Sequence, residues 1–260
     1  MFSISREELF LGAPYKLGEI CKIHQLTLGE ICLGEGAIGM GRYNYYVGLL
    51  TMDIDDVKET LEKKGFPVDD SMFEDFSVFE YLILSATNDK GFFLELQKAL
   101  TTFIKEDILI SPKSKTIIVG KPQQRRVIKQ EEFEELANAL RAHNKMRIKQ
   151  PPPENETEMQ KRFRLKREMR EKVKERQAKK GDGDGSEAEF ADIMSSLCTM
   201  NIGINALNIK DYTIYQIKEQ LERAQLREKY YTELDMIMAG ADSKKIKPIH
   251  YVRNLLKEVN

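Results

Sequence analysis

The sequence predicts a mainly α-helical (α+β) protein. In chain order we expect a helical N-terminal domain with a small β-hairpin/helix module, a basic helical linker and a C-terminal helical domain. Two observations predict this class. Apolar residues recur at helical spacing behind capping pairs of the form Ser/Thr-x-x-Glu/Gln. Between residues 107 and 128 the apolar period changes to two, which is typical of strands.

The first hundred residues are predicted to form a compact helical unit. Capping boxes mark three helix starts, at Ser5 with Glu8, Thr27 with Glu30 and Ser77 with Glu80. Further helices are expected over 43–50, after Asp53 and after Asp89, and the last of these carries a long apolar stripe. Residues 15–23 also fit a short strand.

A β-β-α module is predicted next. Alternating apolar residues at 108–110 and 117–119 flank a Ser-Pro-Lys-Ser turn, which indicates a hairpin, and 125–128 is a candidate third strand. A helix is expected over 130–143. Its inward residues would be Phe133, Leu136 and Leu140.

Three prolines at 151–153 indicate a domain boundary, because such a run is stiff and cannot continue a helix. The predicted division is residues 1–150, a linker over 151–185 and a C-terminal domain over 186–260. Within the linker, residues 160–180 contain eleven Lys or Arg against three Glu, a net charge of +8 in a chain whose total is -1. A Gly-Asp run at 181–185 favours a flexible break.

The C-terminal part is predicted to contain one kinked helix or two short ones. Thr213 and Gln216 form a capping pair ahead of an apolar stripe, whose spacing slips over 225–229 before Gly240 ends the helix. The stripe begins with Ile214, Ile217 and Leu221. It fits either a core face or a partner-binding surface, and these three residues are candidate partner-binding residues.

The same open alternative applies to the basic helix predicted over 158–180. Arg164, Arg167 and Arg170 are candidate partner-binding residues, since guanidinium groups can neutralise phosphates or meet an acidic protein surface. Interleaved glutamates and few aromatic residues favour a solvated or protein-facing helix over a nucleic-acid site.

No pattern predicts a catalytic, cofactor or metal site. Gly34, Gly36 and Gly39 match a dinucleotide-binding spacing, but a helix cap lies just upstream instead of a buried strand, so a loop between helices is the better interpretation. Residues 182–193 do not form a calcium loop, because Glu187 stands where the loop requires Gly and Ile193 where it requires Glu. The three histidines, His24, His143 and His250, are isolated. We therefore expect a protein that is not an enzyme.

The cysteines and the hydropathy bound the compartment. Three cysteines far apart in sequence argue against a disulfide framework, and we expect them to act as buried small apolar side chains. The start lacks a signal-peptide pattern, and no window approaches the 18 apolar residues of a membrane span. The protein is expected to stay where it is made.

Four stretches carry a family resemblance. They are "YKLGEICKIHQLTLGEI", "RYNYYVGLLTMD", "FEELANALRAHN" and, most specifically, the closing "AGADSKKIKPIHYVRNL". Together they resemble a group of tail morphogenesis proteins from tailed phages of Gram-positive hosts, which are compared with tail assembly chaperones. The two helical parts joined by a basic linker are also similar to the layout of those chaperones.

The resemblance implies a non-enzymatic chaperone that binds the tape-measure protein in the host cytoplasm and gives way as tail-tube subunits polymerise. Three alternatives stay open. The first is a virion structural component, such as an adaptor or minor tail protein. The second is a nucleic-acid-binding accessory protein that uses residues 158–180, and the third is a nucleotide-dependent enzyme built on residues 34–39.

Overall fold

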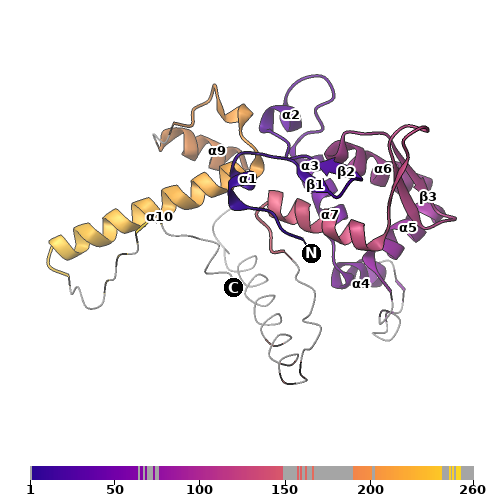
Figure 1. Ribbon diagram of the computed structural model, residues 1–260. Helices are drawn as coiled ribbons and strands as arrows, with labels where there is room; N and C mark the ends of the chain where they lie inside the picture. Colours follow the sequence, from indigo (N-terminus) through magenta and orange to yellow (C-terminus); the bar gives the residue numbers. More distant parts are fainter. Residues whose placement is uncertain are drawn as a thin grey trace. The chain divides into compact units, whose positions relative to one another are not determined.

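The computed structural model describes residues 2–63, 65, 66, 68, 73, 76–148, 157, 159, 162, 166, 190–200, 203–241, 246, 248 and 250–252 (Figure 1). The chain divides into two compact units. The first comprises Met1–Ile148 together with Leu207–Asn260, and the second comprises Lys149–Ala206. The predicted fold class, mainly helical with a small β component, is confirmed.

The first unit opens with a short helix, a hairpin and a second short helix. These elements are α1 (Arg6–Phe10), β1 (Tyr15–Leu17), β2 (Cys21–Ile23) and α2 (Leu28–Cys32). Complete capping boxes at Ser5 and Thr27 start α1 and α2, as predicted. The single strand expected over 15–23 is instead an antiparallel hairpin, because Gly18 adopts a φ of 49° in the turn that folds the segment back.

Helices fill the next part of the unit. They are α3 (Met40–Thr51), α4 (Ile54–Lys63), α5 (Val78–Asn88) and α6 (Lys90–Ile104). Ser77 forms the capping box of α5, and the Asp89 carboxylate accepts the first free N–H groups of α6. Asp53 accepts hydrogen bonds from the first N–H groups of α4. The three helix starts predicted from capping boxes, at Ser5, Thr27 and Ser77, are confirmed.

The predicted β-β-α module is confirmed together with its third strand. It consists of β3 (Ile108–Ser111), β4 (Thr116–Val119), β5 (Arg126–Ile128) and α7 (Gln130–His143). The sheet is antiparallel in the order β3-β4-β5. One face is buried and packs on α6 and α7, through Ile108, Ile110, Ile117, Val119 and Ile128. The other face is open to solvent.

The main core lies between α6, α7 and their neighbours. The apolar stripe of α6 is buried at Leu96, Leu100 and Phe103, and the rings of Phe79 and Phe133 lie 5.3 Å apart. Leu136 and Leu140 are buried as expected. Each of these side chains contributes about 1.5–3 kcal/mol through removal from water.

A second apolar cluster joins the N-terminal residues to α7 and to the helix that begins at Ile214. Leu9 of α1, Ala142 of α7 and Tyr215 of the last helix are buried together, with Phe2, Ile4 and Ile148 packed around them. The last helix, α10 (Ile214–Met238), follows a 3-10 turn, η2 (Ile209–Asp211), that lies against α2. α10 is one helix of 25 residues, so the alternative of two short helices is wrong.

The second unit contributes α9 (Phe190–Thr199) to the described residues. Its apolar residues recur at helical spacing, with Leu197 buried and four further apolar residues half-buried. The helix predicted over 158–180, apart from three single residues, and the Gly-Asp break lie outside the described residues. The three-part domain division stays a prediction. The structure groups 207–260 with the N-terminal residues instead of with α9.

Candidate functional site

The start of α10 is fixed by pairing between two helix caps. Thr213 and Thr27, the N-cap residues of α10 and α2, form an isolated antiparallel bridge, and the Leu28 N–H donates to the Tyr212 carbonyl at 2.9 Å. The Thr213 hydroxyl also donates to Gln25 Oε1 at 3.2 Å. The predicted capping box therefore both starts the helix and ties it to the N-terminal residues.

The three apolar residues proposed from the sequence lie on the docked part of α10. Ile214 and Ile217 are buried inside the first unit, and Leu221 is half-buried. This is the core alternative that the sequence left open. Their binding to a partner stays a prediction. Arg164, Arg167 and Arg170 lie outside the described residues, so the structure does not place them.

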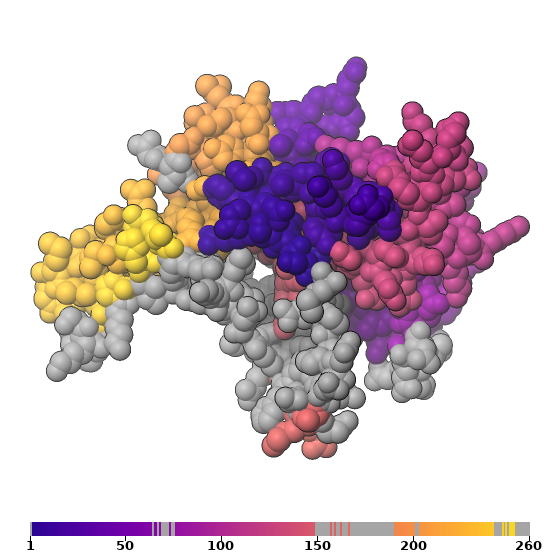
Figure 2. Space-filling view, in the orientation of Figure 1, coloured from indigo at the N-terminus to yellow at the C-terminus, as the bar shows by residue number. Residues whose placement is uncertain are grey.

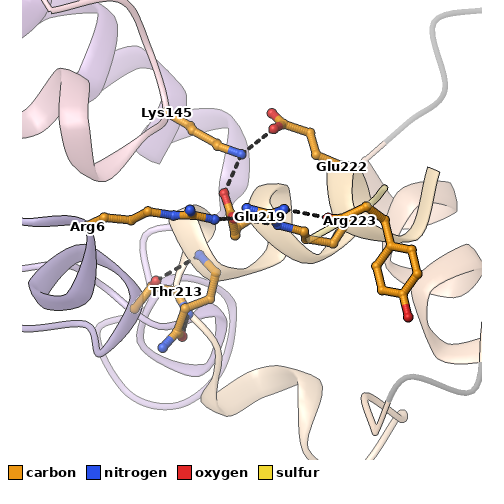
Figure 3. A network of polar contacts seen from close by, with 8 residues as sticks. Arg6, Lys145, Thr213, Glu219, Glu222 and Arg223 are labelled. Carbon is orange, nitrogen blue, oxygen red and sulfur yellow. Dashed lines mark hydrogen bonds and ion pairs between the residues drawn. The ribbon is translucent and has the colours of Figure 1, made fainter. Parts of the chain in front are cut away.

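A buried carboxylate holds the first half of α10 against the unit (Figure 3). The Glu219 side chain is 4% exposed and is surrounded by cations. Arg6 donates to its Oε1, Lys145 Nζ lies 2.7 Å from Oε2, and Arg223 Nε lies 3.1 Å from Oε1. Lys145 also pairs with Glu222. The network thus joins α10 to Arg6, the first residue of α1, and to Lys145, which follows α7.

The electrostatics favour the charged form of Glu219. Burial alone would raise the pKa of this carboxyl, but the hydrogen bonds from Lys145 and Arg6 outweigh it and hold the pKa below its usual value. Lys145 also lies 5.9 Å from the centroid of the Tyr215 ring. Because the Glu219 carboxylate stays ionised, it compensates the charges of the partly buried Arg6, Lys145 and Arg223 side chains.

The second half of α10 has no buried residue and carries exposed apolar side chains. Tyr231 is 47% exposed, Met236 49% and Met238 84%. In Figure 1 this end of α10 lies away from the other helices and strands of its unit. The helix ends in a Schellman motif at Gly240, whose φ is 96°, as the sequence predicted.

Residues near 250 return to the exposed half of α10. The Tyr230 ring lies 5.1 Å from His250 and 6.0 Å from Tyr251, and Arg223 donates to the Tyr251 carbonyl at 2.6 Å. The yellow surface in Figure 2 shows this segment lying against the helix. An open groove of about 540 Å³ is lined by Gln225, Glu228, Lys229, Thr232, Glu233, Met236 and Ile246.

The glycine-rich loop lies between two helices, as interpreted from the sequence. Gly34 and Gly36 follow α2, and Gly39 is the N-cap residue of α3. The element that precedes this loop is a helix and not the buried strand that a dinucleotide site requires.

The three cysteines differ from one another in exposure. All three cysteines are free; Cys21 is buried as expected, but Cys32 is exposed and Cys198 is half-buried, so the expectation was wrong for these two. Within the described part of the chain, no cluster of three or more His, Cys, Asp or Glu residues could hold a metal ion. No helix there is long and apolar enough to cross a membrane.

Sequence reasoning missed the residues around Glu219. The only local signal was Arg223, four residues later on the same helix face. Arg6 lies 213 residues away and Lys145 lies 74 residues away, so periodicity and capping patterns carry no information about them.

One known family model matches the C-terminal part of the chain. Residues 177–255, less than a third of the chain, match the model of the YomV second domain. This family is phage-derived, of the Bacillus phage SPBc2 type, so the match fits a phage protein. No curated protein and no solved structure matches the chain.

Proposed function

We propose that the protein is a non-enzymatic assembly protein of a tailed phage that holds the helical tape-measure protein during tail assembly. The family resemblance supports this proposal, and so does the match to a phage-derived domain that spans the whole of α10. The single observation that carries it is the exposed apolar half of a helix whose other half is fixed.

The exposed half of α10 suits a helical partner. It presents Tyr231 and Met238 seven residues apart, which is two turns along one face, and methionine adapts to partners of different shape. Three exposed side chains give a small contact area, so each contact would be weak and replaceable. That property is what a holder needs if tail-tube subunits are to displace it.

The binding surface in this proposal differs from the one predicted from the sequence. Ile214 and Ile217 are buried within the first unit, so a partner could reach them only if α10 left its position. Tyr231, Met236 and Met238 are already exposed. We therefore assign the partner to the second half of α10 and give the first half the task of anchoring it.

A first experiment compares infected cells with finished particles. Quantitative mass spectrometry is applied to the lysate and to purified phage particles. A protein that is abundant in lysate and missing from particles acts during assembly, as we propose. Stoichiometric presence in particles would replace the proposal with the virion structural alternative.

A second experiment tests the surface itself. The chain is co-expressed with segments of the tape-measure protein, and the captured amount is compared between the wild type and a Met236→Ser/Met238→Ser variant. We expect about tenfold less capture by the variant, because two exposed apolar contacts are lost. Leu207→Ser is the matched control, since Leu207 is 83% exposed and lies outside α10. Equal capture by all three proteins would contradict the assignment.

A further inference from the structure

The outer face of the sheet carries an unbroken apolar row. Leu109 of β3 lies opposite Ile118 of β4, which lies opposite Val127 of β5. Leu109 is 46% exposed, Val127 is 39% exposed, and Ile118 between them is half-buried. Side chains directly opposite each other on one face are in contact, so these three form one continuous patch across all three strands.

The alternation of hydrogen bonds in the sheet decides which way the backbone N–H and C=O of Val127 point. The Gly120 N–H donates to the Asp107 carbonyl at 2.9 Å, which extends the β3–β4 ladder by one pair. Antiparallel pairs alternate between bonded and non-bonded. Leu109 and Ile118 are therefore a bonded pair, and Ile117 and Val119 turn toward β5.

The consequence for β5 follows from the same alternation. Arg126 and Ile128 bond to β4, so the N–H and C=O of Val127 point to the free edge of the sheet. Neither group has a partner outside the sheet among the described residues. This edge can accept one more strand, with Val127 offering both backbone hydrogen bonds and an apolar side chain.

The surroundings of the row are strongly basic. Residues 108–129 contain six Lys or Arg and no Asp or Glu. Lys115 pairs with Glu80 and Arg126 pairs with Glu106. Lys113, Lys121 and Arg125 are exposed, and none of them has an ion-pair partner among the described residues. The uncompensated charge lies in the turns at both ends of the strands.

We propose that the outer face and the β5 edge of this sheet bind an extended acidic segment of a partner protein. The segment would add a strand beside β5, lay an apolar residue against Val127 and place its carboxylates near Lys121 and Arg125. This surface is separate from α10, so the proposal does not depend on the function proposed above.

Charge and composition select this occupant over two others. A second copy of the chain would bring the same basic strands edge to edge, and lysine and arginine at an edge oppose such pairing. Single-stranded nucleic acid is anionic, but it binds sheet faces through stacked aromatic rings, and this row is aliphatic. An acidic polypeptide satisfies the charge, the apolar row and the free backbone groups together.

The test measures binding of short labelled peptides to the full-length protein by fluorescence anisotropy. The probe is a capped Glu-Val-Glu-Ile-Glu-Val-Glu peptide. Its comparison probes are the same peptide with Lys in place of Glu, a heptaglutamate, an acidic probe N-methylated at alternate residues, and a 12-nucleotide single-stranded DNA. We expect saturable binding of the acidic probe, weaker at higher salt, and at least about tenfold weaker binding of every comparison probe.

Protein variants locate the site. Val127→Pro removes the N–H that points to the free edge and replaces the valine side chain, and Lys121→Glu/Arg125→Glu reverses the local charge; each is expected to weaken probe binding about tenfold. Lys16→Glu/Lys22→Glu reverses two exposed charges in the other hairpin and should leave binding within about twofold. Circular dichroism checks that each variant folds.

Four results would overturn the proposal. They are no saturable binding of the acidic probe, equal binding of the basic probe, unchanged binding by the charge-reversal variant, and tighter binding of the oligonucleotide than of the peptide. If Val127→Pro does not fold, the N-methylated probe decides the edge on the unaltered protein. Equal affinity of the methylated and unmethylated probes would exclude strand addition.

Discussion

Glu219 is the residue on which the position of α10 depends most. Its carboxylate has three cationic partners and is almost fully buried, so a neutral side chain there removes the ion pairs of Glu219 with Arg6, Lys145 and Arg223 and leaves Lys145 only its pair with Glu222 among the ion pairs of the described residues. Breaking a buried ion pair costs about 3 kcal/mol or more. We expect Glu219→Gln to lower the free energy of unfolding by about 2–3 kcal/mol, since Arg6 and Arg223 retain some solvent.

Urea unfolding measures this effect, and a neighbouring glutamate provides the control. Glu222 also pairs with Lys145, but its side chain is 46% exposed. Glu222→Gln should therefore change the free energy of unfolding by less than about 1 kcal/mol. Equal losses in the two variants would mean that burial of Glu219 contributes nothing to the network.

His143 is expected to make stability depend on pH. Both ring nitrogens are buried without a hydrogen-bond partner among the described residues. Burial, with a smaller effect from His24, lowers the pKa of His143 from 6.5 to about 4. The unfolded chain therefore binds a proton between these values that the folded chain does not. Stability from this residue is complete above pH 6.5 and falls as pH drops toward 4, by about 3 kcal/mol in total.

The measurement is the free energy of unfolding at pH 7, 6, 5 and 4.5 for the wild type and His143→Leu. The variant has no group to titrate at this position, so its stability should change less over this range. The difference between the two proteins should grow steadily as pH falls. A constant difference would show that His143 already carries a proton or finds a partner in the folded state.

At the scale of elements, helix starts could be predicted because their signals are local. A capping box needs two residues three positions apart, and those at Ser5, Thr27, Ser77 and Thr213 all start helices. The sequence predicted one strand over 15–23 where the structure has the β1–β2 hairpin. Each of these strands has only three residues, which are too few to establish a period.

The continuity of α10 has a related explanation. The apolar spacing slips over residues 225–229, which suggested a kink, but Gln, Leu, Arg, Glu and Lys are all strong helix formers. The backbone therefore continues through the slip. What changes there is the face that can be buried, and this is where the docked half gives way to the exposed half.

The two halves of α10 should differ in local stability. We expect amides of 217–223 to exchange with deuterium at least about tenfold more slowly than those of 229–237, because opening the docked half breaks the Glu219 network and uncovers Tyr215. Hydrogen-exchange mass spectrometry measures both segments. Similar rates would mean that the helix opens as one unit.

A variant at the end of the helix sharpens this comparison. Gly240→Ala places a Cβ where φ is 96°. Apart from its two chain neighbours, no described residue has an atom within 4 Å of that position, so the cost of about 1 kcal/mol is conformational. Exchange should accelerate in the last turns and stay unchanged over 217–223. Acceleration in both segments would again indicate a single cooperative unit.

At the scale of the whole molecule, the return of α10 to the N-terminal residues could not be predicted from the sequence. Its contacts pair residues far apart, such as Gln216 with the Phe10 carbonyl at 2.7 Å, and no periodicity reports such pairs. The prolines at 151–153 predicted a domain boundary, but they gave no sign that residues beyond 206 group with the first unit. Burial of Ile214 and Ile217 in this contact could not be predicted for the same reason, and their binding to a partner stays a prediction.

This arrangement predicts that two separate fragments will reassemble. Fragment 1–148 lacks the helix that covers Leu9 and Ala142 and that compensates Lys145, so it should unfold at lower urea concentration than the full chain. Adding fragment 203–260 should restore stability and give a 1:1 complex in size-exclusion chromatography. The same mixture with Glu219→Gln in the second fragment should bind more weakly, by roughly thirtyfold if about 2 kcal/mol is lost. The opposite result is that fragment 1–148 is as stable alone as in the full chain and does not bind 203–260. The C-terminal residues would then form an independent domain, which is what the three-part division predicted from the sequence.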